Sequence, residues 1–428
     1  MNYQPKILLD GKPVEKITAF LFPKGGNENP KTLLANAGKS FQGSIVLGMG
    51  FTFDDTNENA TSIATMHELI AKDPRNADRI FPYIGGEEVN SSPTHSHHRY
   101  VINFGDMSED EARKYSDLMS IVEEKVKPSR LKQNREIRSR YWWRFGENTP
   151  ALFRAIVQCD RVLVCSLHSP YLMFAFLPSN CVFSHALAVF ALPNYSNFGV
   201  LQSSIHEIWA RFFGSSLEDR LRYTPSDCFE TFPFPENWEI DAILEVAGEA
   251  YYTYRAQLLI NTNQGLTSTY NRFHDPQETD PDILKLRDLH SEMDNAVLAA
   301  YGWTDIDTTC EFILDYEDEE DTTTPDSHKK SRKKPYRYRW TQATHDEVLA
   351  RLLDLNQKRY DQEMIGGKKA EKGGKKKREE GKKNAKTPKS QPSIPEADRQ
   401  LALIPEPILQ RRGYANEQLD VWSTIEQT

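Results

Sequence analysis

Three apolar runs near the middle of the chain constrain its fold most strongly. They comprise residues 161–165, 171–177 and 182–192, and prolines at 170, 178 and 193 punctuate them. The runs are rich in aromatic and β-branched side chains, which favour a pleated, buried surface. Proline lacks the N–H that an interior strand must donate, so it marks strand ends. The pattern predicts several buried strands that form the centre of a sheet.

Helices are expected on both sides of these strands. Ser108 and Glu111 form a capping box ahead of residues at helical spacing, and Pro128 ends or kinks that helix. Short strands precede it at Ser44–Leu47 and Arg99–Phe104. Residues 201–213 predict another short helix after the central runs.

The chain becomes helical after Trp238, where we place a domain boundary. Residues 240–261 form one candidate helix, and Asp280-Pro281 begins a second one that stops at Gly302. A third starts at Thr344 and ends before Gly366. The following Lys/Gly/Glu-rich sequence cannot bury apolar surface, which predicts disorder. The predicted class is therefore α+β, with parts at 1–238, 239–365, 366–399 (disordered and basic) and 400–428 (a C-terminal tail).

The sequence shows no segment typical of membrane or secreted proteins, and this indicates the cellular compartment. It has no run of the roughly eighteen apolar residues that a membrane-spanning helix needs, and its start has neither a basic cluster nor an apolar signal core. The five cysteines are widely spaced and never arranged as Cys-x-x-Cys, which indicates reduced thiols. We expect a cytoplasmic protein without a membrane partner.

Charge is strongly segregated along the chain. The formal net charge is −9, yet residues 368–389 hold eleven Lys or Arg against three Glu. Between Lys125 and Arg144, eight Lys or Arg accompany only Glu136, whereas acid concentrates at 315–321. Further basic and aromatic residues follow at 329–340. A local basic segment can bind a polyanion even in an acidic protein, so the distribution matters more than the sum.

Common catalytic patterns are incomplete in this sequence. Gly38-Lys39-Ser40 resembles the end of a phosphate-binding loop, but Leu33 stands where its first glycine would be. His95, His97 and His98 lie together without Cys or acidic residues at metal-ligand spacing, so we predict no metal.

Two further patterns also favour a structural interpretation. Ser203-Ser204-Ile205-His206 brings a hydroxyl near an imidazole without an evident third partner, and a helix face or a DNA contact is the better interpretation. Glu123-Glu124-Lys125 resembles half of a nuclease site, but a solvated charged helix face explains it better.

The basic segment from Lys125 to Arg144 is the strongest physical signal for nucleic acid. Lysine neutralises phosphates, and the guanidinium fork can contact phosphates or bases. We expect the adjacent Trp142 and Trp143 to lie in the core. A solvated basic connection is the alternative interpretation of the whole segment. The candidate DNA-binding residues here are Lys127, Arg130, Lys132, Arg135, Arg138, Arg140 and Arg144.

Several segments, in order, resemble the target recognition and C-terminal helical domains of MmeI-like DNA methyltransferases and methyltransferase–endonuclease fusions. The resemblance covers roughly residues 6–360. Its anchors are Ser40–Ser44, Ile80–Glu87, Arg99–Phe104, Trp142–Arg144, Phe198–Trp209, Arg222–Thr224, Thr231–Pro235, Gly265–Phe273 and Asp282–Trp303.

The resemblance implies a mixed-sheet target recognition domain over 1–238, which reads a short duplex DNA site, and a helical C-terminal domain over 239–365. It also implies adenine methylation in a restriction–modification or phage-defence system. The adenine methyltransferase hallmark, Asn or Asp followed by Pro-Pro and an aromatic residue, does not occur in the sequence. We therefore expect no catalytic residue and no cofactor in this chain, which is either a separate specificity subunit or a fragment. S-adenosylmethionine would bind a separately encoded methyltransferase subunit or domain.

Base-reading residues are expected on the turns between the central strands. Loops there could enter the major groove, where Asn pairs with adenine and other polar side chains contact base edges. The candidates are His168, Tyr171, Asn180, Asn194 and Asn197, together with Ser203 and His206.

Two other function classes remain open at this stage. One is a DNA nuclease with an unrecognised metal site. The other is a non-catalytic scaffold or gene remnant that binds polyanions nonspecifically through the basic tail.

Overall fold

The computed structural model describes residues 7–9, 11–21, 28–217, 220–314 and 336–381. The chain divides into two units, Met1–Gly367 and Lys368–Thr428, and the account below concerns the first. In the described part of the chain, no helix combines the length and apolarity required to cross a bilayer.

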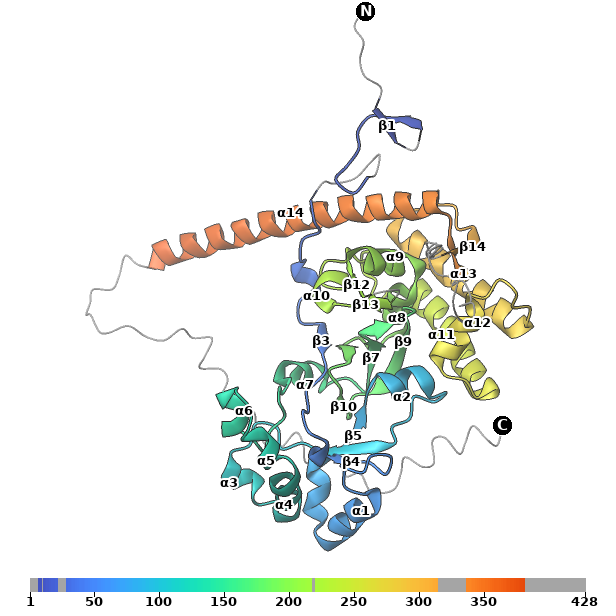
Figure 1. Ribbon diagram of the computed structural model, residues 1–428. Helices are drawn as coiled ribbons and strands as arrows, with labels where there is room; N and C mark the ends of the chain where they lie inside the picture. The colour runs from blue at the N-terminus through green and yellow to red at the C-terminus, as the bar shows by residue number, and fades with distance from the viewer. Residues whose placement is uncertain (1–6, 10, 22–27, 218–219, 315–335, 382–428) are drawn as a thin grey trace, which may run out of the picture. The chain divides into compact units, whose positions relative to one another are not determined.

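An antiparallel sheet in the order β3-β11-β7-β9 forms the centre of the first unit (Figure 1). Its strands are β3 (Ser40–Gln42), β11 (Leu187–Phe190), β7 (Arg161–Ser166) and β9 (Phe174–Pro178). β7 pairs with β9 from Arg161 opposite Pro178 to Cys165 opposite Phe174. Three of these strands come from the predicted apolar runs, and their side chains are almost entirely buried, which confirms the predicted sheet centre.

A second sheet, β10-β5-β6-β4, adjoins the first. Its strands are β10 (Val182–Phe183), β5 (Ile80–Ile84), β6 (Arg99–Ile102) and β4 (Thr52–Phe53). β10 pairs with β5 in parallel, and the other pairings are antiparallel. Because β10 and β11 belong to one predicted run, a single stretch of chain supplies strands to both sheets.

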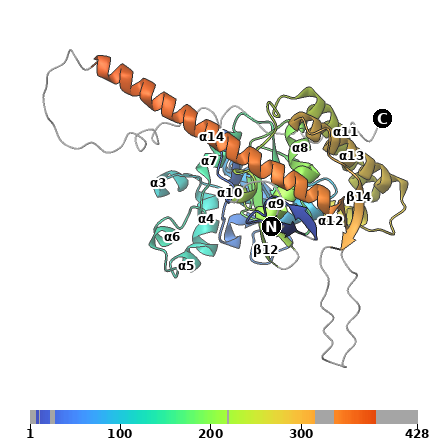
Figure 2. The ribbon, with the colours of Figure 1, turned by 90° about the horizontal axis from the view of Figure 1, so that it is seen from above.

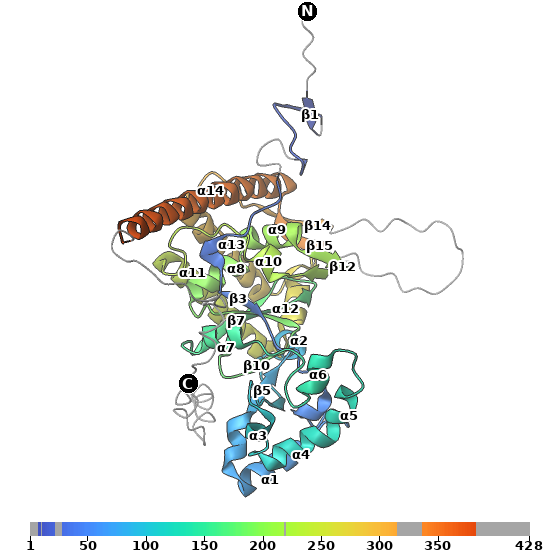
Figure 3. The same ribbon diagram turned by 90° about the vertical axis from the view of Figure 1, so that its left-hand side faces the viewer.

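Short helices gather around β4–β6, as Figures 1 and 3 show. They are α1 (Ile63–Lys72), α3 (Glu109–Ala112), α4 (Ser116–Lys125), α5 (Lys127–Arg130) and α6 (Glu136–Arg140). The capping box predicted at Ser108 is present, with Glu111 accepting from the Ser108 backbone. This region has its own hydrophobic cluster, which includes Phe51, Met119 and Trp142.

Five other helices pack around β7 and β9, and Figure 2 shows α8, α11 and α13 beside one another. They are α8 (Tyr195–Gln202), α9 (Ser204–Phe213), α11 (Ala242–Thr262), α12 (Leu266–Phe273) and α13 (Pro281–Tyr301). α8 and α11 approach so closely that a Cβ at Gly248 would collide with the Tyr195 carbonyl. Only glycine fits this contact.

The remaining elements complete the unit. They are β1 (Ile7–Leu9), β2 (Lys12–Val14), α2 (Gly86–Ser91), α7 (Pro150–Ile156), β8 (His168–Ser169), β12 (Ser215–Leu217), β13 (Arg220–Arg222), α10 (Pro225–Cys228), β14 (Cys310–Leu314), β15 (Tyr336–Trp340) and α14 (Gln342–Gly381), with 3₁₀ helices at Leu34–Asn36, Met49–Phe51 and Pro74–Arg79.

The predicted α+β class is confirmed, whereas several element boundaries are corrected. Ser44–Leu47 forms only isolated bridges, at Ser44 and Ile45, instead of a strand. The helix predicted over 201–213 is two helices, because Ser203 leaves helical geometry to cap α9.

The third predicted helix is longer than expected. It does not end before Gly366, and α14 continues to Gly381. Each glycine weakens a helix by about 1 kcal/mol relative to alanine, but the intervening Lys and Glu are good helix formers. The rest of the segment predicted to be disordered, and the tail from 400 to 428, lie outside the described residues.

The predicted boundary near Trp238 lies within one hydrophobic cluster. That cluster joins Phe174 of the central sheet to Tyr251 of α11, Met293 of α13 and Leu352 of α14. The division of the chain into domains at this position stays a prediction.

Candidate nucleic-acid interface

Arg130, a predicted DNA contact, is buried and has a structural role instead. Its side chain is fully buried, and its Nη2 donates to the carbonyls of Val46 (3.0 Å) and Arg144 (3.1 Å). Burial, and then the charge of Arg138, lowers the pKa of Arg130 to about 10, so the group stays protonated at neutral pH. A guanidinium that holds backbone carbonyls inside the fold cannot contact DNA in this conformation.

Two further cations of the basic segment also make internal contacts. Arg144 donates to the carbonyls of Met107 (Nε, 3.0 Å) and Asp106 (Nη2, 2.7 Å). Lys127 donates to Glu123 and lies 4.5 Å from the centre of the Trp142 ring. Trp142 and Trp143 are buried, as predicted. Both cations are half-buried, and their first role is to join neighbouring segments.

The other four predicted DNA contacts of the segment lie on α6 or in the residues just before it. Lys132, Arg135 and Arg140 are exposed, and Arg138 is half-buried. Arg138 lies 3.4 Å from a Glu147 oxygen, and Arg135 lies 3.7 Å from the same atom. Exposed ion pairs of this kind contribute little to stability, so these side chains can exchange Glu147 for phosphate.

The predicted base-reading residues occupy different environments. His168, on β8, and Asn194, which caps α8, are exposed. Asn180 is half-buried in the turn before β10. Tyr171 is also half-buried, and its hydroxyl donates to Asn271 (2.9 Å).

Asn197, Ser203 and His206 were predicted as DNA contacts, but all three are buried. Asn197 accepts from the Asn194 backbone in the capping box of α8, and Ser203 caps α9. The His206 ring shares a 3.0 Å hydrogen bond with the Tyr223 hydroxyl. Burial lowers the pKa of His206 to about 3, which keeps the ring neutral. These residues therefore stabilise the fold and do not reach a ligand.

The alternative metal and nuclease patterns also meet structural partners. His98 faces Glu88, which Arg99 already binds at 2.8 Å. Glu123 is paired with Arg113 and Lys127, as a solvated charged face would be. Within the ranges that the structure describes, no three His, Cys, Asp or Glu side chains come together as metal ligands.

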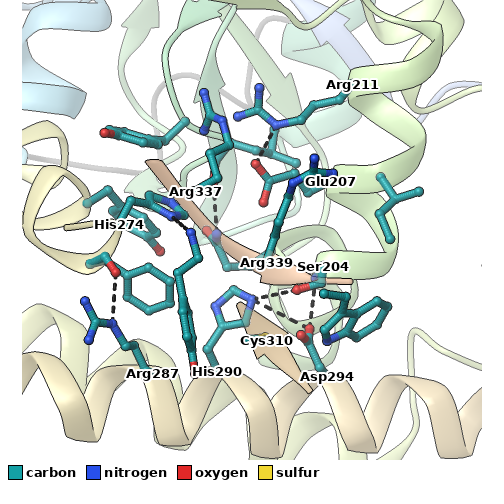
Figure 4. A pocket seen from close by; sticks show the side chains of 18 of the residues that line it. Ser204, Glu207, Arg211, His274, Arg287, His290, Asp294, Cys310, Arg337 and Arg339 are labelled. Atoms are coloured by element: carbon teal, nitrogen blue, oxygen red, sulfur yellow. Dashed lines mark hydrogen bonds and ion pairs between the residues drawn. The ribbon is translucent and has the colours of Figure 1, made fainter. Parts of the chain in front are cut away.

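A cavity of about 210 Å³, lined by aromatic and charged side chains, lies between α9, α12, α13 and β15. Figure 4 shows charged groups from these elements around it: Glu207 and Arg211 from α9, Asp294 from α13, and Arg337 from β15. Arg211 Nε donates to Glu207 Oε1 at 2.7 Å. Burial raises the pKa of Glu207, but the charges of Arg211 and Arg337 outweigh burial and lower that pKa to about 2. The carboxylate is ionised at neutral pH.

The histidine that lines this cavity from the end of α12 is fixed in one tautomer. His274 Nδ1 accepts a hydrogen bond from the Tyr338 backbone (3.1 Å), so its proton is on Nε2. Burial lowers the pKa of His274 well below its ordinary value. Its ring stacks on Tyr171 with centres 4.7 Å apart.

A serine, a histidine and an aspartate also meet at the cavity, but not as a catalytic triad. The Nε2 atom of His290 lies 3.4 Å from Ser204 Oγ and 3.6 Å from Asp294 Oδ1. A triad needs the two contacts on opposite ring nitrogens. Asp294 instead accepts from the Ser204 backbone (2.8 Å), and burial raises its pKa. These contacts join the start of α9 to α13.

Two arginines of the cavity hold the turn after β8. Arg211 and Arg337 each donate from Nη2 to the Pro170 carbonyl, at 3.0 and 2.8 Å. The turn carries His168 on one side and Tyr171 on the other. Residues from α9 and β15 therefore position a predicted base-reading turn.

Sequence reasoning did not find this cluster. Its members are scattered between positions 171 and 345, and no local spacing joins them. The one signal was the alternation of basic and aromatic residues at 337–340, at the end of the basic stretch 329–340. The acidic segment at 315–321 lies outside the described residues.

Comparison with known proteins identifies the type of fold. Residues 28–236, just under half of the chain, match the model described as the MmeI target recognition domain. A solved structure of the Type IIL restriction–modification enzyme MmeI, in complex with DNA, is similar to this chain with a TM-score of 0.54 at 19% identity. The similarity covers 82% of this chain and 39% of that enzyme, so the chain spans well under half of the enzyme's length. A comparison with curated proteins gave no match.

The resemblance predicted from the ordered sequence anchors is therefore confirmed: residues 28–236 match the MmeI target recognition domain, and the fold of the chain is shared with part of that restriction–modification enzyme.

Proposed function

We propose that this chain reads a short sequence in duplex DNA as the specificity portion of an adenine-specific DNA methyltransferase. The match of residues 28–236 to a target recognition domain carries this proposal. The MmeI structure, which contains DNA, supports it through a shared fold. The biological setting would be a restriction–modification or phage-defence system in the cytoplasm.

Two surfaces of the described chain suit such a role. The exposed cations around α6, Lys132, Arg135 and Arg140, can neutralise phosphates without sequence preference. His168 is exposed on β8, directly before the turn that Arg211 and Arg337 hold in place, so it can read a base edge from a fixed position.

Methyl transfer would belong to a partner methyltransferase, supplied as a separate subunit or a further domain. That partner would bind S-adenosylmethionine and receive the flipped adenine. The absence of the Asn/Asp-Pro-Pro-aromatic tetrapeptide from this sequence supports the division of labour.

Selection from a random duplex library, with the purified full chain, tests the proposal. We expect enrichment of one short motif, with a loss of about 1–3 kcal/mol per mismatched base pair. Equal binding of all sequences would instead support a nonspecific polyanion binder, and magnesium-dependent cleavage by the chain alone would support a nuclease. Either outcome contradicts the proposal.

A charge-removal variant tests the surface around α6. Replacing Lys132, Arg135 and Arg140 together by Ala should weaken binding to every sequence. It should also make the slope of log affinity against log salt less steep by roughly 2–3, because each phosphate contact contributes about 0.9. The matched control replaces the exposed Lys72, Lys285 and Lys358 by Ala, which removes the same charge elsewhere. An equal loss in both variants would exclude a specific role for α6.

A further inference from the structure

Guanidinium groups outnumber carboxylates among the residues that line the cavity beside Pro170. Arg211, Arg287, Arg337 and Arg339 line it, whereas its carboxylates are Glu207 and Asp294. Burial raises the pKa of Asp294, so this carboxyl group offsets the positive charge of the arginines less than an exposed aspartate would. His274 adds no charge at neutral pH, because burial lowers its pKa well below its ordinary value.

The arginines that line the cavity differ in the contacts that they make within the fold. Arg287 is held by the carbonyls of Phe273, Arg272 and Asp275, and Arg211 by Glu207. By contrast, Nε of Arg339 is buried and has no hydrogen-bond partner among the described residues. An unsatisfied buried donor of this kind costs free energy unless an acceptor reaches it. The Nε atom itself is out of reach of solvent, so an anion in the cavity would pair with the other nitrogens of the Arg339 guanidinium, which also lines it.

The walls of the cavity are largely aromatic. Tyr171, Tyr270, Phe273, Tyr338 and Trp340 all contribute, and Tyr171 already stacks on the His274 ring. Flat rings pack against such walls with favourable stacking. The cavity thus combines aromatic surfaces with guanidinium groups, which is the lining that a charged aromatic molecule requires.

The volume of the cavity and the charge of its lining further restrict the class of ligand that can bind. A cavity of about 150 Å³ holds benzene, so a volume of about 210 Å³ accommodates one aromatic ring with a small substituent. Burial raises the pKa of Glu207, but Arg211 and Arg337 outweigh it and keep this lining carboxylate ionised. It therefore repels a phosphate dianion more strongly than a carboxylate monoanion.

We propose that this cavity binds a small planar carboxylate with a single aromatic ring, whose carboxylate accepts from Arg339. The site is separate from the exposed cations of α6 and from methyl transfer. Because Arg337 and Tyr171 line the cavity and also contact the turn after β8, an occupied cavity would stiffen that turn.

Isothermal titration of the full chain with three probes tests the site: benzoate, inorganic phosphate and adenosine monophosphate. We expect benzoate to bind with a dissociation constant of roughly 10 µM–1 mM, as a ligand of this size allows. Phosphate lacks the ring, and ionised Glu207 repels the phosphate of the nucleotide more strongly than a carboxylate, so both should bind at least tenfold more weakly. If benzoate does not bind, or binds no better than phosphate, the proposal is wrong.

Two variants locate the binding. Arg339→Gln should weaken benzoate binding at least tenfold, whereas Arg135→Gln, outside the cavity, should leave it unchanged. Ser291→Leu keeps every charge and fills part of the lining, so it should also weaken benzoate binding, and it remains informative if Arg339→Gln fails to fold. Unchanged affinity in a folded Arg339→Gln or Ser291→Leu protein would place the ligand elsewhere.

Discussion

The basic segment at 125–144 and the cavity beside Pro170 are both rich in arginine, but they use it in opposite ways. In the segment, neighbours in sequence separate in the structure: Arg130 is buried against carbonyls while Arg135 and Arg140 are exposed. In the cavity, Arg211, Arg287 and Arg337 are far apart in sequence and converge. A stretch of basic residues in the sequence therefore does not show which of them share a surface. The tertiary fold decides which charged side chains come together in a site.

The largest effect is expected at Arg130. Arg130→Ala removes two hydrogen bonds to backbone carbonyls and leaves a cavity, so the free energy of unfolding should fall by about 2–4 kcal/mol. Urea denaturation at neutral pH measures this change. A loss below about 0.5 kcal/mol, the usual range for surface substitutions, would return Arg130 to the set of candidate DNA contacts.

Next in size is the pH dependence that Glu207 confers. Its pKa falls from 4.5 to about 2 on folding, because Arg211 and Arg337 outweigh the opposing effect of burial. Its stabilising contribution is therefore complete above pH 4.5 and is lost as the pH falls toward 2. Glu207→Gln should lower stability by about 2 kcal/mol at pH 7, and the difference from the parent protein should shrink below pH 4.5.

Urea unfolding at several pH values between 2 and 7 checks this expectation. Glu249→Gln, at an exposed position, is the matched control and should follow the parent protein. If the Glu207→Gln difference is the same at every pH, the arginines do not act on this carboxylate.

A smaller loss is expected at Arg144, which connects the segment to the loop at 106–107. Arg144→Lys keeps the charge but loses the fork that binds the Met107 and Asp106 carbonyls, so stability should fall by about 1 kcal/mol. Denaturation midpoints measure it. An unchanged midpoint would show that charge alone suffices at this position.

The smallest change in stability is expected at Arg135. Its side chain is 67% exposed and lies 3.7 Å from Glu147, so Arg135→Ala should alter stability by less than about 0.5 kcal/mol. DNA affinity measured on the same protein should nevertheless fall, since this cation is available to phosphate. A stability loss as large as that of Arg130→Ala would remove the distinction between buried and exposed members of the segment.

Local patterns predicted much of the fold. The apolar runs at 161–192 became β7, β9, β10 and β11, and the caps at Ser108 and Asp280 lie where their side chains indicated. These features depend on neighbours in sequence, which one sequence displays fully.

Long-range features could not be predicted in the same way. The burial of Arg130 depends on Val46, which lies 84 positions away, and the cavity depends on a β15 residue that reaches Pro170 across 167 positions. A hydrophilic residue also gives no periodic signal for burial, so His206 was assigned to DNA although it lies in the core. The end of α14 was missed because two glycines outweighed the helix-forming residues around them.

Arg211 and Arg337 both donate a hydrogen bond to the Pro170 carbonyl, and this has a consequence for transferring the recognition region between proteins. Arg211 lies inside the 28–236 region that matches the recognition domain, while Arg337 lies 101 positions beyond its end. If that region alone were transferred into a relative, the turn would keep its hydrogen bond from Arg211 but lose the one from Arg337. The transplant that preserves the geometry of His168 must include β15, so the exchangeable module is larger than the sequence match.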